Sequence, residues 1–204
     1  EHYDGMEPAM KDILRLLLLT GQRVQEVSGM QWAEIDWETM LWSIPPVRIK
    51  TRKKRNEPHI LPITPMMEEI IKRQPVIQYA DRLGKTRPAK AVFSGRNDPD
   101  KPLEWRSLSR AVNRLCERSE IQKFSPRQIR GTVKSHMARI KVMKEIRDRI
   151  QNHALTDIAD THYDAHDYLD EKQAGLMKWE RELKRIVRIS NESHIVDFRS
   201  VGPT

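Results

Sequence analysis

Hydrophobic residues recur with the spacing of a helix at the start of the chain and again through its second half. In residues 7–19 the apolar positions that share one face are Met10, Ile13, Leu14, Leu17 and Leu18. This periodicity predicts a buried helix, which Thr20-Gly21 ends because glycine commonly follows the last turn of a helix. The same reasoning predicts further helices after Thr64-Pro65 and at about 23–31, 105–118, 126–140, 142–150 and 168–189.

Between the second and third of these helices, the pattern changes to short apolar runs that are typical of strands. Residues 32–50 contain such runs, and His59–Ile63 alternates as a returning strand. Residues 51–58 between them are polar and very basic, which predicts the tip of a hairpin. Residues 80–90 have the composition of a basic loop. The predicted fold class is therefore mainly α with a small antiparallel β-sheet (α+β).

A length of 204 residues suits one domain. We expect this domain to cover residues 1–189, followed by a largely polar tail over residues 190–204. Three alternatives for the tail are a short strand, docking in trans on a neighbouring protomer, and disorder. Because the sequence begins with Glu1 rather than methionine, we expect it to be a fragment of a longer protein.

Charge and cysteine content narrow the class of partner and compartment. Lys and Arg outnumber Asp and Glu by 37 to 29, a formal net charge of +8, which favours a polyanion because basic side chains release condensed counterions from phosphates. The single cysteine, Cys116, excludes an intramolecular disulfide and favours a reducing, cytoplasmic setting. The longest apolar run, residues 13–19, contains Arg15 and is too short to cross a membrane, so no membrane partner is expected.

Three arginines stand at predicted helix starts. Arg23 begins the second helix, and Glu26 is placed three residues later to support it. Arg127 and Arg130 follow Ser125-Pro126, an expected N-cap and first helical residue, and their i, i+3 spacing puts both on one face. Positive charge at this end of a helix opposes the helix dipole, which favours a functional reason for it. Taken singly, an arginine of this kind is more often a solvated surface residue.

Basic residues also gather around the predicted hairpin. Lys50 ends the first run of strands and opens the polar tip. Its alternative role is that of a solvated lysine in a turn. The neighbours that we expect to contact a nucleic-acid backbone are Arg48, Arg52, Lys53, Lys54 and Arg55.

The second half of the chain carries a histidine and a tyrosine ten residues apart, His153 and Tyr163. A lone residue of either type is more often a packing or hydrogen-bonding residue. Close to them lie His162, His166 and Asp167, which could suggest a metal site. Their spacing matches no known metal-ligand motif, so no metal is expected.

The order of these segments resembles the catalytic domain of the tyrosine recombinases, in particular the integrases of phages and genomic islands. The resemblance covers about residues 7–187 and implies the tyrosine recombinase catalytic-domain fold. The matching segments, in chain order, are Leu17–Glu26 (LLLTGQRVQE), Ile49–Thr51 (IKT), Phe124–Thr132 (FSPRQIRGT), Asn152–Leu155 (NHAL) and Tyr163.

The resemblance implies a role for each matching residue. Tyr163 would attack the scissile phosphate and form a 3′-phosphotyrosyl link. Arg23 and Arg130 would clamp the non-bridging oxygens, for which planar guanidinium groups are suited. Lys50 would protonate the leaving 5′-oxygen, and His153 would donate a hydrogen bond to the phosphate. No metal or nucleotide cofactor is implied, because the covalent link conserves the bond energy for rejoining.

Two features depart from the family pattern. Arg127 stands where the family usually has histidine, and an arginine cannot act as a base in a protein. This leaves open how the tyrosine, whose ordinary pKa is about 10, loses its proton. The interval from His153 to Tyr163 is one residue longer than expected, which makes Tyr168 a rival nucleophile.

The implied function is site-specific DNA recombination or integration by strand cleavage and rejoining. The implied partners are double-stranded DNA attachment sites and other protomers in a recombination synapse, a tetramer for the full-length protein, whereas the fragment alone is expected to be a monomer. One alternative is a DNA-binding integrase relative with impaired cleavage, because Arg127 replaces the usual histidine. Another is a basic helical scaffold for RNA or an acidic protein, which explains the charge but not the ordered segments.

Overall fold

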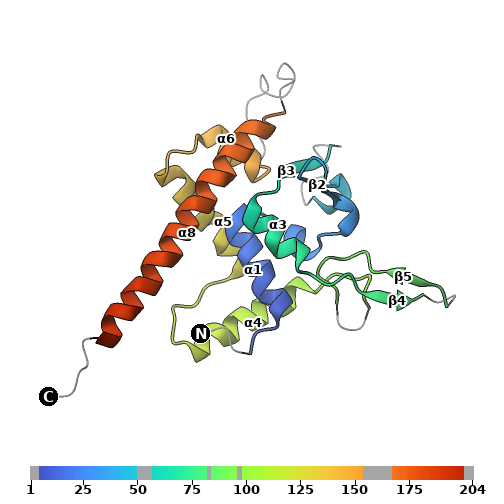
Figure 1. The fold of residues 1–204 in the computed structure, drawn as a ribbon, viewed down its shortest axis with the longest axis horizontal. Helices are drawn as coiled ribbons and strands as arrows, with labels where there is room; N and C mark the ends of the chain where they lie inside the picture. Colours follow the sequence, from blue (N-terminus) through green and yellow to red (C-terminus); the bar gives the residue numbers. More distant parts are fainter. Residues whose placement is uncertain (1–4, 50–56, 82–83, 96–97, 154–166, 200–204) are drawn as a thin grey trace.

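The computed structural model describes residues 5–49, 57–81, 84–95, 98–153 and 167–199, with side chains as far as Arg188. Within these ranges the predicted mainly helical α+β class is confirmed (Figure 1), and no helix is long and apolar enough to cross a membrane. The helices are α1 (Pro8–Thr20), α2 (Val24–Ser28), α3 (Pro65–Lys72), α4 (Trp105–Arg118), α5 (Pro126–Arg139), α6 (Lys144–Ile150) and α8 (Leu169–Arg199).

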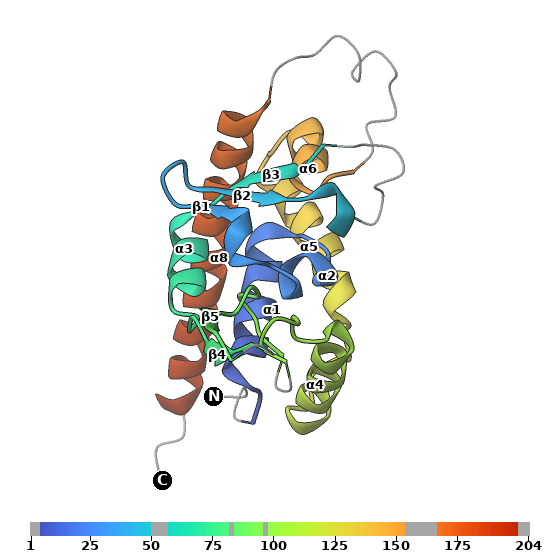
Figure 2. The ribbon, with the colours of Figure 1, turned by 90° about the vertical axis from the view of Figure 1, so that its right-hand side faces the viewer.

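Helix α1 occupies the centre of the molecule (Figures 1 and 2) and contacts α2, α3, α5 and α8. Proline at its first position suits a helix start, where the missing N–H has no intrahelical partner. Gly21 ends the helix in a left-handed conformation with φ 62°, and its N–H donates to Leu17 O at 2.9 Å. The apolar side chains that α1 buries in the core are Ile13, Leu14, Leu16, Leu17 and Leu19.

The strands predicted on either side of the basic hairpin form one antiparallel sheet. It consists of β1 (Ile35–Asp36), β2 (Leu41–Ile44) and β3 (His59–Pro62), in that order. Trp42 lies opposite Ile35 on one side and Leu61 on the other, so the three side chains share the face that is buried against the core. Two short 3₁₀ helices flank these strands, η1 (Trp32–Glu34) and η2 (Pro46–Arg48).

The segment predicted as a basic loop at 80–90 contains part of a second hairpin. Strand β4 (Gln78–Ala80) pairs antiparallel with β5 (Thr86–Pro88). Asp81 closes the turn, because its N–H donates to Lys85 O at 3.0 Å and its carboxylate accepts from Lys85 N at 3.0 Å. An aspartate whose side chain accepts from the main chain is a local signal for a turn, and the basic composition of this segment obscured it.

Two helix ends also differ from the prediction. Helix α2 stops at Ser28 rather than at about residue 31, because Gly29 follows it. Helix α8 continues to Arg199, ten residues past the predicted end at 189. No glycine or proline occurs between Gly175 and Gly202-Pro203, so no residue strongly opposes the helix there. Residues 190–199, assigned to a separate tail, are therefore helical.

Helix α8 is fastened to three other elements along its length. Near its start, the Lys172 ammonium donates to Ile60 O of β3 at 3.0 Å. The indole N–H of Trp179 donates to Leu18 O of α1 at 2.7 Å. Glu180 accepts from the N–H of Met66 at 3.2 Å, which satisfies a free donor in the first turn of α3. Helix α8 also packs against α6 (Figure 2).

We predict that Trp179→Ala destabilises the domain by about 3–5 kcal/mol, because it removes a 2%-exposed aromatic side chain and its hydrogen bond to α1. Urea unfolding followed by circular dichroism measures this change. Val187→Ala is the matched control on the same helix, since Val187 is 53% exposed and a surface change there should stay within about 0.5 kcal/mol. Equal effects of the two substitutions would contradict the proposed anchor.

Candidate active site

Arg23 is the residue before α2, and Glu26 holds both its main chain and its side chain. The Arg23 N–H donates to Oε2 of Glu26 at 2.9 Å, and the Arg23 guanidinium Nη1 donates to Oε1 at 2.8 Å. The Glu26 side chain is 1% exposed, whereas that of Arg23 is 24% exposed. A buried carboxylate therefore orients a guanidinium that keeps a face toward solvent.

Arg130 reaches the same region from α5. Ser125 is the N-cap of this helix, and its N–H donates to the side chain of Gln128 at 2.6 Å, so the helix starts where the sequence predicts. Arg130 is the fifth residue of α5 and therefore lies near the N-terminal end of the helix. Its guanidinium donates to Gly21 O at 3.0 Å and to the main-chain carbonyl of Gln151.

Gly21 permits this arrangement for two reasons. Its φ of 62° is unfavourable for residues with a side chain. In addition, a Cβ atom on Gly21 would lie 2.5 Å from Nε2 of Gln151 and 3.1 Å from Cγ1 of Val133. The same Gln151 amide donates to Arg130 O at 2.9 Å, so moving it aside would break a buried contact. The glycine thus lets α5 and the end of α6 approach the turn between α1 and α2.

The two guanidinium groups concentrate positive charge in one place. Burial and then the charge of Arg23 lower the pKa of Arg130 to about 10, while the charge of Glu26 raises it. Arg130 is therefore still cationic at neutral pH. A guanidinium has five N–H donors. Among the described residues, two donors of Arg130 and one of Arg23 are used. An anion with several acceptor oxygens would satisfy the remaining donors and offset the charge.

His153 lies just past the end of α6. Asn152 before it has φ 48°, a left-handed conformation that asparagine tolerates, and the His153 N–H donates to Asp148 O at 2.9 Å. The ring atom Nδ1 lies 2.9 Å from Nζ of Lys134 and 3.1 Å from Oδ1 of Asp148. Burial lowers the pKa of His153; the bond with Asp148 opposes this, but the charges of Arg130 and Lys134 add to it, so the imidazole is neutral at pH 7.

A second histidine, His59 on β3, is buried behind the arginines. Its Nε2 lies 3.0 Å from Ile150 O, the last residue of α6, and donates to that carbonyl in the neutral form. Burial, followed by the charge of Lys172, lowers the pKa of His59 to about 3. His59 is therefore a neutral link that holds the sheet against the end of α6.

The structure separates the two arginines of the predicted pair on α5. Arg130 is half-buried and bonded to two carbonyl groups, whereas Arg127 is exposed. In the part of the chain that is described, Arg127 makes no hydrogen bond or ion pair. Its guanidinium is thus at the surface beside the site, where it can add positive charge and donors.

Arg48 was predicted to contact a nucleic-acid backbone, but its guanidinium is turned into the protein. Its side chain is 15% exposed, and its guanidinium donates to the carboxylate of Glu34 and to the main-chain carbonyl of Glu26. Glu34 in turn accepts from the indole of Trp42 at 3.1 Å. Arg48 therefore connects the end of η2 to α2, because its donors face buried acceptors rather than solvent.

Several predicted site residues lie outside the described residues. These are Tyr163, Lys50, Arg52, Lys53, Lys54 and Arg55. The rival nucleophile Tyr168 is described and half-buried, with its ring centroid 3.5 Å from the guanidinium carbon of Arg149. The structure thus brings together Arg23, Glu26, Arg130 and His153 from three separate segments of the sequence.

Three residues of this site were missed by reasoning from the sequence: Gln151, Lys134 and Asp148. Lys134 could have been found, since it follows Arg130 by four residues and so shares its helix face. Asp148 and Gln151 carry no such signal, because their roles depend on how α6 ends beside α5 and α1.

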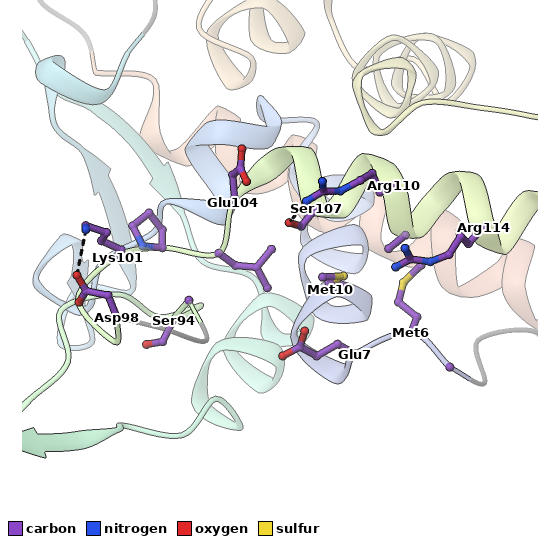
Figure 3. A pocket seen from close by; sticks show the side chains of 15 residues that line it. Met6, Glu7, Met10, Ser94, Asp98, Lys101, Glu104, Ser107, Arg110 and Arg114 are labelled. Carbon is purple, nitrogen blue, oxygen red and sulfur yellow. Dashed lines mark hydrogen bonds and ion pairs between the residues drawn. The ribbon is translucent and has the colours of Figure 1, made fainter.

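A pocket of about 860 Å³ lies elsewhere, between the start of α1, residues 94–104 and α4 (Figure 3). The close-up shows Met6 and Met10 on one side and Arg110 and Arg114 of α4 on another. Of the predicted site residues that the structure describes, none lines it. This pocket therefore does not mark the site that the arginines form.

We predict that Gly21→Ala destabilises the domain by about 1–3 kcal/mol, through left-handed strain and the contact with Gln151. Gly131→Ala is the matched control, because no atom lies within 4 Å of a Cβ built on Gly131. Alanine is favoured over glycine within a helix, so this control should be neutral or stabilising by up to about 1 kcal/mol. Thermal and urea unfolding of both variants distinguish these outcomes. A Gly21→Ala protein as stable as the parent would refute the close-packing argument.

His59 predicts a specific pH dependence of stability. The folded state resists protonation of His59 down to about pH 3, whereas the unfolded state binds this proton near its ordinary pKa of 6.5. The contribution of neutral His59 to the free energy of unfolding is therefore fully present above pH 6.5. It decreases as the pH is lowered, by about 1.4 kcal/mol per pH unit between pH 6 and pH 4. The difference between the parent and His59→Gln, measured by urea unfolding at each pH, isolates this contribution from that of other groups. Parallel curves for the two proteins would exclude it.

Comparison with known proteins agrees with this geometry. Residues 5–169 match the model of the phage integrase family. Prophage integrase IntF of Escherichia coli (strain K12) is 26% identical over 156 residues, which are 76% of this chain and 30% of that protein. The chain thus spans about a third of the length of this relative.

Solved structures show the same fold at low identity. An integrase from mycobacterium phage Brujita superposes with a TM-score of 0.62 at 16% identity, over 85% of this chain and 52% of that one. The lambda integrase catalytic core has a TM-score of 0.54 at 14% identity, over 74% of this chain and 87% of that one. The fold and the family match lead to one conclusion: the chain belongs to the phage integrase family.

Proposed function

We propose that this chain is the part of a site-specific recombinase that cuts and rejoins DNA strands through a 3′-phosphotyrosyl intermediate. The observation that carries the proposal is the pair of guanidinium groups of Arg23 and Arg130, which are held by hydrogen bonds and have further donors that no described residue uses. His153 stands beside them as a neutral imidazole. A tetrahedral or trigonal-bipyramidal phosphate is an anion of matching charge and acceptor number.

In the proposed reaction, the Tyr163 oxygen attacks the scissile phosphorus while the bond from phosphorus to the 5′-oxygen breaks. Arg23 and Arg130 bind the non-bridging oxygens, on which negative charge grows in the transition state. Lys50 donates a proton to the 5′-oxygen, so the products are a 3′-phosphotyrosyl ester and a free 5′-hydroxyl. Rejoining reverses these steps with the 5′-hydroxyl of the partner strand, and the tyrosine recovers its proton.

Arg127 takes no part in acid–base chemistry in this proposal, because a guanidinium does not release its proton in a protein. Its exposed position suits a contact with DNA beside the scissile phosphate. The positive charge of three arginines would also favour the phenolate form of a tyrosine brought close to them. Water at the site is then a sufficient acceptor for the phenolic proton.

The proposed partners are double-stranded DNA and further protomers. Among the structural neighbours, XerH recombinase is bound to its difH substrate, and lambda integrase forms a dimer on a core site and a tetramer on a Holliday junction. We place residues 1–189 in the catalytic domain and assign the end of the chain, from residue 190, to docking in trans in such an assembly. A DNA substrate implies a cytoplasmic location in a bacterial cell.

The decisive test uses the full-length integrase that contains this chain and a nicked duplex spanning the ends of its genetic element. The expected result is a protein–DNA adduct that survives denaturation, is lost in Tyr163→Phe and is retained in Tyr168→Phe, since only the first variant lacks the nucleophile. Circular dichroism confirms that both variants fold. Mass spectrometry of the digested adduct identifies the linked tyrosine.

Three other outcomes of this experiment would each support a different conclusion. An adduct that persists in Tyr163→Phe and disappears in Tyr168→Phe makes Tyr168 the nucleophile. Salt-dependent duplex binding without any adduct, restored to cleavage by Arg127→His, identifies a DNA-binding relative with impaired cleavage. Stronger binding to single-stranded RNA than to duplex DNA supports the scaffold alternative.

A further inference from the structure

A lysine, an aspartate and a histidine form a compact triangle on the far side of the candidate phosphate site. Lys134 lies one helical turn beyond Arg130 on α5, with a side chain that is 29% exposed. Its ammonium donates to Oδ1 of Asp148 on α6 and lies 2.9 Å from Nδ1 of His153. The Asp148 side chain is 12% exposed, so the triangle is partly shielded from water.

The contacts of Nδ1 decide which nitrogen of His153 carries the proton. Nδ1 has two neighbours, Lys134 at 2.9 Å and the Asp148 carboxylate at 3.1 Å. A neutral imidazole nitrogen either donates or accepts, so it can satisfy only one of them. An ammonium group has donors and no acceptor, so its contact requires a lone pair on Nδ1. If Nδ1 carried the proton instead, two N–H groups would face each other.

The Asp148 carboxylate has cationic neighbours other than His153. Its carboxylate already accepts from Lys134, and Nζ of Lys144 lies 3.6 Å from its other oxygen. Its main-chain carbonyl accepts the N–H of His153 at 2.9 Å, which fixes the position of the ring relative to α6. The arrangement in which Lys134 donates both to the Asp148 carboxylate and to His153 has the lone pair on Nδ1 and the proton on Nε2.

We propose that Lys134 is a positioning residue that holds His153 in its Nε2–H form, so that the ring presents a hydrogen-bond donor to the substrate phosphate. Lys134 itself does not touch the substrate in this proposal. The charges around the ring are Arg130 and Lys134 from α5 and Asp148 from α6, with Lys144 on the outer side of Asp148. The role of the donor in catalysis rests on the proposed recombinase function, whereas the tautomer does not.

One consequence concerns the open question of the tyrosine proton. A histidine whose Nε2 carries a hydrogen cannot accept a proton through that atom. In the Nε2–H form, therefore, His153 stabilises the charge on the phosphate and is not the base for Tyr163. The proton of the nucleophile has to leave by another route.

The direct test measures the tautomer of His153 by long-range ¹H–¹⁵N NMR on the full chain without DNA, with His153→Gln to assign the signal. We expect the Nε2–H form in the parent. In Lys134→Met, which keeps the length of the side chain but removes its donors, Asp148 becomes the remaining partner. The ring should then change to the Nδ1–H form, and its titration should move to higher pH because a cation is lost and the carboxylate is freed.

Lys144→Met is the matched control, since it removes a cation from Asp148 without removing a contact to His153. It should leave the tautomer unchanged. Cleavage of nicked DNA at saturating concentration is expected to slow by about 10- to 100-fold in Lys134→Met, the effect of losing one hydrogen bond to a charged group, and by less than about twofold in Lys144→Met.

The outcomes separate the two proposals. An Nδ1–H form in the parent, or an unchanged tautomer in a folded Lys134→Met protein, overturns the role of Lys134. If Lys134→Met does not fold, the measurement on the parent still decides the tautomer, and Lys134→Arg, which retains a cationic donor, should preserve it. If the tautomer is as expected but no protein makes a DNA adduct, the positioning role stands and the recombinase function fails.

Discussion

The candidate site depends on one half-buried guanidinium, that of Arg130, which donates hydrogen bonds to the ends of two helices. Gly21 is the C-cap of α1 and Gln151 is the C-cap of α6, and Arg130 donates to the carbonyl group of each. Carbonyl groups at helix C-termini lack intrahelical partners and carry partial negative charge, so a cation stabilises both. Arg130 therefore joins α1, α5 and α6 while keeping donors available for a ligand.

The position of Arg130 between these helix ends also brings its positive charge close to that of Arg23. Arg23 lies close enough to Arg130 to disfavour its charge, and the nearby anion that offsets the pair is the carboxylate of Glu26. Burial, and then the positive charges of Arg130 and Lys134, lower the pKa of His153, although Asp148 contacts the ring. Fixed donors and positive charge concentrated in this way suit a phosphate group, whose oxygens accept hydrogen bonds and whose charge offsets that of the guanidinium groups.

Support for the site extends well beyond the residues that face it. Arg48 connects η2 to the main chain of Glu26, and His59 connects β3 to the last turn of α6. Lys172 and Trp179 fasten α8 to β3 and α1. The sheet and the long C-terminal helix thus connect to the elements that carry the two arginines.

The sequence by itself determined the fold class, most helix positions and the three segments that meet at the site, because these follow from periodicity, from local start and stop signals, and from the order of the segments. It could not show that Arg48 turns inward, that residues 80–90 contain part of a hairpin, or that α8 continues to Arg199. Nor could it pair Arg130 with Gly21, or Lys134 with His153, which lie 109 and 19 residues apart. Side-chain direction and partner choice were decided only by the tertiary structure, because a buried donor takes whichever acceptor the packing of distant elements brings within reach.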